Sequence, residues 1–160
     1  FKEPLRSELY SKVSTTGENK DGVICYDQDG KLIGNWWLST SPSDLLSAEN
    51  YESYAIAFVY SNYEPDKIMV SIGSDFNGTE GLSLGAYQAD GPPPENVTPS
   101  SGKVTYKLYQ YITGWPPTHG QRVGLLIVEM LDEDTIKVEA FADTTSETRD
   151  FTSNAKVYDR

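Results

Sequence analysis

The sequence predicts an all-β fold: a single antiparallel up-and-down barrel of eight or nine strands, preceded by a short N-terminal helix. From Val23 onward, apolar side chains recur with a period of two, which is typical of strands with one buried face. Turn-forming residues divide this region into short runs, and no helical pattern separates one run from the next. Consecutive strands should therefore pair as an antiparallel meander. A meander can protect its edges by closing into a barrel, and a two-sheet β-sandwich is the alternative.

The predicted helix covers residues 3–13. Pro4 suits a first helical turn because a proline there gives up only an N–H group that the helix cannot use. Leu5, Leu9 and Val13 recur every four residues, so they share one face of the helix.

The first predicted hairpin joins strands at Val23–Asp27 and Lys31–Leu38 through the turn Gln28-Asp29-Gly30. The pair Asp-Gly supplies the positive φ angles that tight hairpin turns require. The same alternation predicts the later strands. They are expected at residues 54–61, 67–73, 82–90, 104–112, 123–131, 135–142 and 155–158.

Two irregular segments interrupt these strands. Residues 89–102 are too rich in proline, glycine and serine for a strand, and we expect a surface loop or lid there. Residues 113–120 contain two consecutive prolines and separate the next two strands. No segment has the composition of an interdomain linker. The chain should therefore form an N-terminal helical arm over residues 1–20 and one barrel domain over residues 21–160.

Charge and hydropathy exclude several classes of partner. The 160 residues include 13 Lys and Arg against 24 Asp and Glu, for a formal net charge of −11. An acidic surface repels nucleic acids and anionic lipids, so we expect neither as a partner. No apolar run approaches the roughly 20 residues that a membrane-spanning helix needs, so we expect no membrane insertion.

Catalytic and metal-binding patterns are poorly represented. His119 is the only histidine and Cys25 the only cysteine, too few for a zinc site, and no nucleophile motif accompanies them. Residues 27–30 resemble the start of a calcium-binding loop, but Lys31 and Leu38 stand where later ligands are needed. We therefore predict no catalytic residue, no metal and no cofactor. Cys25, within an apolar run, is expected to be a small buried hydrophobe.

Glu129 is the acidic residue that invites a catalytic interpretation. It interrupts the apolar run from Leu125 to Leu131. If it points inward, it is a buried acid that could serve a hydrolase, as could His119. If it points outward, it is ordinary strand alternation. The outward orientation is favoured because carboxylates are rarely buried.

Two short motifs carry a resemblance to a known group of proteins. Gly34 and Trp36 form a Gly-x-Trp motif on an early strand, and Tyr158-Asp159-Arg160 places an aromatic and a basic residue on the last one. This pattern resembles the calycins, the group of lipocalins and fatty-acid-binding proteins. The resemblance implies that Trp36 plugs one end of the barrel and that Arg160 or Lys156 packs over it as a cation on an aromatic face. It also implies a lid at residues 39–53.

Together these features predict a non-enzymatic β-barrel module, secreted or periplasmic, that binds a small apolar or aromatic ligand. An accessory domain of a larger exported protein fits the same description. The mouth is expected to consist of residues 39–53, 89–102 and 115–119. The predicted contact residues are Tyr87, Trp115 and His119. A carbohydrate- or protein-recognition sandwich and a hydrolase are the alternatives, and the sequence leaves the oligomeric state open.

Overall fold

The computed structural model describes residues 2–13, 15, 23, 25–42, 51–73, 82, 85–112 and 118–160. Within the helices and strands, the side chains of residues 51, 52, 112, 118 and 119 are not part of this description.

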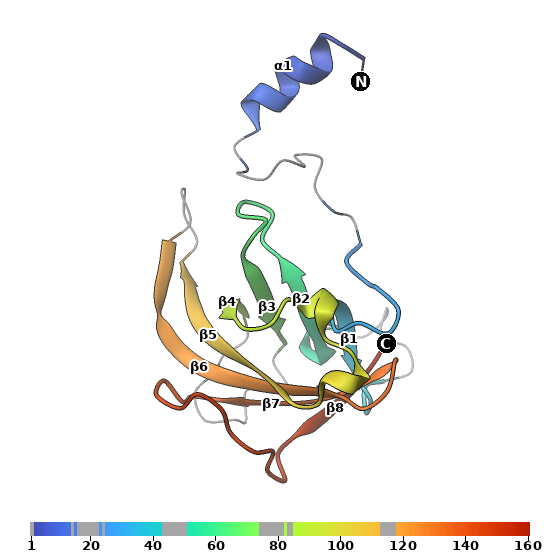
Figure 1. Ribbon diagram of the computed structural model, residues 1–160, viewed down its shortest axis with the longest axis vertical. Coiled ribbons are helices and arrows are strands. Elements are labelled where there is room, and N and C mark those ends of the chain that lie inside the picture. The colour runs from blue at the N-terminus through green and yellow to red at the C-terminus, as the bar shows by residue number, and fades with distance from the viewer. Residues whose placement is uncertain are drawn as a thin grey trace.

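Eight antiparallel strands form a closed barrel in which each strand pairs with its sequence neighbours (Figure 1). The strands are β1 (Gly34–Leu38), β2 (Ala55–Tyr60), β3 (Ile68–Ile72), β4 (Gly85–Asp90), β5 (Val104–Ile112), β6 (Thr118–Met130), β7 (Thr135–Phe141) and β8 (Lys156–Asp159). The pairing of β1 with β8, in which Leu38 lies opposite Tyr158, closes the ring. The predicted barrel is confirmed, and closure excludes the alternative of a two-sheet sandwich.

The helix α1 (Leu5–Lys12) precedes the barrel and confirms the predicted short helix. Its predicted apolar face is not buried. Leu5 and Val13, which directly follows the helix, are 46% and 38% exposed, and none of the helical residues is buried.

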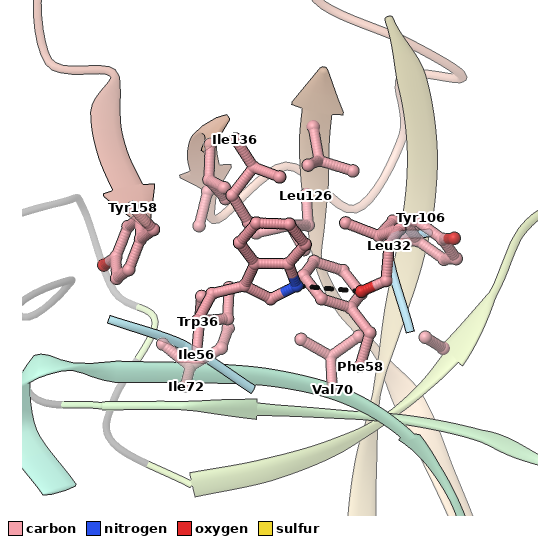
Figure 2. Close-up of a cluster of buried hydrophobic side chains, with 14 of the residues drawn as sticks. Leu32, Trp36, Ile56, Phe58, Val70, Ile72, Tyr106, Leu126, Ile136 and Tyr158 are labelled. Atoms are coloured by element: carbon pink, nitrogen blue, oxygen red, sulfur yellow. Dashed lines mark hydrogen bonds between the residues drawn. The ribbon is translucent and has the colours of Figure 1, made fainter. Parts of the chain in front are cut away.

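Side chains that alternate along the strands fill the barrel interior. Trp36, Phe58 and Tyr106 have no exposed surface and belong to one continuous cluster of buried side chains, shown in part in Figure 2. The rings of Phe58 and Tyr106 lie 5.6 Å apart, centroid to centroid, in a tilted arrangement. On β5, Tyr106 and Leu108 point inward as their alternation predicts.

The turn of the first predicted hairpin is confirmed, whereas its first strand, predicted at Val23–Asp27, is not formed by the described residues. Gly30 has a positive φ of 66°, and the N–H of Lys31 donates to the carbonyl of Gln28 at 3.1 Å, as a tight turn requires. However, the described residues between 23 and 33 contain no strand. The reason is topological: β1 already pairs with β2 on one edge and with β8 on the other, so no edge remains for an earlier strand.

The segment before β1 packs against the start of that strand instead. Asp27 Oδ1 accepts a hydrogen bond from the backbone N–H of Asn35 at 2.6 Å. Gly34 makes this approach possible: its φ is +120°, and a Cβ there would lie 2.8 Å from the Cα of Asp27. Cys25, predicted to be buried, is exposed because it lies in this loop and not in a strand.

Strand direction alternates around the barrel, so the connections alternate between its two ends. We call one end the Trp36 end; it carries the segment before β1, Arg160, and the connections β2–β3, β4–β5 and β6–β7. The opposite end carries the connections after β1, β3, β5 and β7. The predicted mouth is therefore wrong in one part, because residues 89–102 follow β4 and lie at the Trp36 end. β1 and β5 end at the opposite end, so residues 39–42 begin the predicted 39–53 part there. Residues 43–50 of that part and residues 115–117 of the predicted 115–119 part lie outside the described residues.

Candidate functional site

Trp36 and Arg160 close one end of the barrel. The indole of Trp36 is fully buried, and its Nε1 donates a hydrogen bond to the carbonyl of Leu32 at 2.8 Å (Figure 2). The guanidinium carbon of Arg160 lies 4.1 Å from the centroid of the Trp36 ring. Its Nη1 and Nη2 donate to the carbonyls of Gln28 and Ile33 at 2.6 and 2.7 Å. The structure thus brings Trp36 together with Arg160 and the loop before β1.

Lys156, the other candidate for this role, lies elsewhere. It begins β8, where it pairs with Val138 of β7, whereas Arg160 directly follows the end of the same strand. Because β8 ends at the Trp36 end, only Arg160 is placed there. A planar guanidinium also suits the position, since it can stack on an indole while its N–H groups reach two carbonyls in its plane.

The loop at residues 89–102 covers the Trp36 end. Its 3-10 helices are η4 (Pro94–Asn96) and η5 (Pro99–Ser101), and Val97 between them is 2% exposed within the core cluster. The carbonyl of Val97 accepts from the N–H of Leu32 at 3.1 Å, which joins this loop to the segment before β1.

Two tyrosine hydroxyls fasten the same loop to the barrel. Tyr106 donates to the carbonyl of Pro92 at 2.8 Å, and Tyr60 donates to the carboxylate of Glu95 at 2.8 and 3.0 Å. Burial, followed by the hydrogen bond to Glu95, raises the pKa of Tyr60 well above its ordinary value, so the hydroxyl keeps its proton and remains a donor. This loop is a fixed cover.

Of the three predicted contact residues, only Tyr87 has a described side chain. Tyr87 lies on β4 with 8% of its surface exposed and belongs to the interior cluster. Trp115 lies outside the described residues. The backbone of His119 lies on β6 opposite Tyr111 of β5, and its side chain is outside the description. The register places Tyr87 beside Gln110 of β5, so the backbones of Tyr87 and His119 flank β5 near the opposite end.

Leu82 fills part of the interior at this opposite end. It lies in the β3–β4 connection, is 3% exposed and packs within the core cluster. A Cβ added to Gly124 of β6 would lie 2.9 Å from Leu82 Cδ1, so the leucine packs directly on this glycine. At Gly85, where β4 begins, an added Cβ would meet no atom of the described residues within 4 Å. Leu82 makes the interior here apolar, and the described residues leave open space beside Gly85.

Glu129 points outward, as the sequence favours. It lies between Val128 and Met130, which face the interior, and it is half-buried opposite Lys137 of β7. The structure therefore places no Glu129 carboxylate inside the barrel.

Among the described residues the buried acid is Glu139, which the sequence patterns did not predict. Glu139 is 2% exposed, and its carboxylate accepts hydrogen bonds from the backbone N–H and the hydroxyl of Thr152 at 2.7 and 2.5 Å. The sequence signal for this burial lies on the outer face of β6 and β7, where Leu125, Ile127 and Phe141 are apolar. Apolar side chains on an outer face predict that another segment covers them.

That cover is the segment at 142–155, which we call the strap. Phe151 of the strap packs on the outer apolar cluster, and Lys137 lies 4.6 Å above its ring. Lys103 forms an ion pair with Asp150, and Lys107 pairs with Glu147 at 2.6 Å. Asp150 and Glu147 thus connect the strap to the barrel wall through these ion pairs.

The described part of the chain contains no group of three His, Cys, Asp or Glu side chains placed to share a metal ion. None of the described helices is long and apolar enough to span a membrane. Comparison with known proteins identifies no relative: no protein-family model, no curated protein and no solved structure matches the chain.

Proposed function

We propose that the protein is a calycin-like, non-enzymatic binding module that takes a small apolar or aromatic ligand into the barrel from the end opposite Trp36. The observation that carries the proposal is the closure of one end by Trp36 and Arg160, reinforced by the 89–102 loop. A barrel closed at one end admits a ligand only from the other.

The interior at that other end supports an apolar ligand. Leu82, Tyr87 and Leu38 belong to the interior cluster and present apolar or aromatic surface. No atom of the described residues would lie within 4 Å of a Cβ at Gly85. Leu82 comes from a connection between strands, so it can move aside without disturbing the strand pairing, and a ligand would replace its contacts.

A fluorescence titration with the neutral apolar probe N-phenyl-1-naphthylamine tests the proposal. We expect saturable binding with enhanced, blue-shifted emission, because the probe enters an apolar interior. Tyr87→Ala should weaken this binding, since it removes an interior aromatic contact. Val157→Ala is the matched control, because Val157 is 37% exposed on the outside of β8. Absence of saturable emission, or equal weakening in the control, would count against the proposal.

We also propose that the module is located outside the cytoplasm, either secreted or periplasmic. Cell fractionation followed by detection with an antibody to the chain tests this location independently of ligand binding.

A further inference from the structure

A cavity lies beside strands β3, β4 and β5, and its lining combines outward-facing side chains such as Gln88 with Tyr60, Ile68 and Ala89, which pack in or against the interior cluster. It is an open cleft with a volume of about 590 Å³, and its lining runs from the β2–β3 turn across β4 to Tyr109 of β5. This volume lies within the roughly 300–1,000 Å³ that is typical of small-molecule sites. Its wall includes Tyr60, Asp66, Lys67, Gln88, Asp90 and Tyr109. We call it the outer cleft.

Gln88 is the residue that points to a polar ligand. It pairs with Met69 of β3 and Tyr109 of β5, and it alternates with the inward-facing Tyr87 and Ala89. The Oε1 atom of Gln88 is buried, and none of the described residues donates a hydrogen bond to it. A buried acceptor without a donor is unfavourable, and the side chain gives up no hydrogen bond at Oε1 when it turns toward a ligand hydroxyl.

Two tyrosines give the outer cleft aromatic surface. The hydroxyl of Tyr60 is held by Glu95 in two hydrogen bonds, so its ring is fixed before a ligand arrives. Tyr109 is half-buried and lies directly across from Gln88 in the β4–β5 register. An amide that can donate and accept, next to aromatic rings, matches a sugar ring, which has hydroxyl groups at its edge and apolar C–H groups on its faces.

The charges around the outer cleft select against anions. Asp66 and Asp90 contribute two carboxylates, and Lys67, whose ammonium group is the only one among the described lining residues, is paired with Asp66 at 3.0 Å. Asp90 is exposed to water, so it offers a cation no desolvated partner. A neutral ligand fits this balance better than an anion or an amine.

We propose that the outer cleft binds a neutral carbohydrate, a short oligosaccharide whose hydroxyl groups hydrogen-bond to the Gln88 amide and whose ring contacts Tyr109. This site is independent of the interior site.

Proton–nitrogen correlation NMR with cellotriose, maltotriose and tri-N-acetylchitotriose at millimolar concentrations tests the proposal. Sialyllactose and spermidine serve as anionic and cationic comparisons. We expect at least one neutral trisaccharide to shift the Gln88 side-chain amide and the Asp90 backbone amide saturably. Gln88→Leu and Tyr109→Leu should each weaken this binding by at least about tenfold. Gln121→Leu, a matched change at an exposed β6 position outside the outer cleft, should leave it unchanged.

Three outcomes would overturn the proposal: no saturable shift with any neutral trisaccharide, binding of sialyllactose or spermidine alone, or undiminished binding by Gln88→Leu. Gln88→Leu should retain the wild-type thermal midpoint, because it removes a buried acceptor to which none of the described residues donates. If it does not fold, Tyr109→Leu decides the matter by the same criterion. The naphthylamine titration of the interior is unaffected by either result, so the two sites fail or succeed separately.

Discussion

The guanidinium of Arg160 stacks on the indole of Trp36 and also donates hydrogen bonds to the loop that leads into β1. The guanidinium carbon lies 4.1 Å from the centroid of the indole, and two of its N–H groups donate to the carbonyls of Gln28 and Ile33. One side chain therefore joins the end of β8, the centre of β1 and the preceding loop. The indole is fixed a second time by its own hydrogen bond to Leu32.

Replacing Arg160 should destabilise the barrel. Hydrogen bonds from a charged group contribute about 1.5–3 kcal/mol, and a partly exposed cation on an aromatic ring adds about 0.5–1 kcal/mol. We expect Arg160→Ala to lower the free energy of unfolding in urea by roughly 2–3 kcal/mol. Arg160→Lys should recover less than half of this, because an ammonium cannot reach both carbonyls while it stacks. Full recovery by lysine would show that charge alone matters.

Asp27 should make the Trp36 end sensitive to acid. Burial pushes the pKa of Asp27 up, but hydrogen bonds from Asn35 and Cys25 and the charge of Arg160 outweigh it, so this pKa lies below its ordinary value. The unfolded-state pKa is near 3.9, so the stabilisation is complete above about pH 5 and is lost as pH falls through the lower folded-state pKa.

Urea unfolding between pH 6 and about pH 2 checks this prediction. Asp27→Asn keeps an acceptor oxygen for the Asn35 N–H but removes the charge, so its stability should fall less steeply with acid than that of the wild type. Asp29→Asn, at an exposed position in the adjacent turn, should retain the wild-type pH dependence. Parallel curves for wild type and Asp27→Asn would contradict the assignment.

Glu139 should anchor the strap. Glu139→Ala leaves the backbone N–H and hydroxyl of Thr152 without their acceptor, which should cost about 1–3 kcal/mol of stability. Hydrogen exchange at the Thr152 amide should accelerate. Glu129→Ala is the matched control on the outer face of the neighbouring strand, and it should cost less than about 1 kcal/mol. Unchanged exchange at Thr152 in Glu139→Ala would remove the anchoring role.

Leu82 should limit access to the interior. Leu82→Ala removes buried apolar contacts, so we expect the free energy of unfolding to fall by about 2–4 kcal/mol. The same change opens space beside Gly124 in the interior and should tighten binding of N-phenyl-1-naphthylamine. Stability and affinity thus move in opposite directions. Weaker probe binding by a folded Leu82→Ala protein would show that Leu82 is a ligand contact and does not obstruct the site.

The sequence predicted the strands well because local alternation encodes them. On β5 the alternating pattern from Val104 to Ile112 matches the observed strand residue for residue. The strand predicted at Val23–Asp27 has suitable residues but no free edge to pair with, and the availability of an edge depends on how the whole barrel closes. Cys25 was predicted to be buried because it was assigned to that strand, and it is exposed because the strand does not form.

Parts of the site depend on contacts that are distant in sequence. Glu139 lies between two apolar residues, and its burial follows from Thr152 in a strap whose path the sequence pattern does not reveal. The mouth was predicted from loop composition, which does not record that residues 89–102 follow an even-numbered strand and so lie at the Trp36 end. Counting strand alternation around a closed barrel would have separated the two ends.

The most direct test of the central claim is a proton–nitrogen correlation NMR titration of the protein with N-phenyl-1-naphthylamine. A ligand that enters from the end opposite Trp36 should shift the backbone amides of Leu82, Gly85 and Tyr87 saturably. The amides of Leu32 and Val97, at the closed end, should keep their positions. Shifts confined to Leu32 and Val97, or no saturable shift at Leu82, Gly85 and Tyr87, would contradict the account.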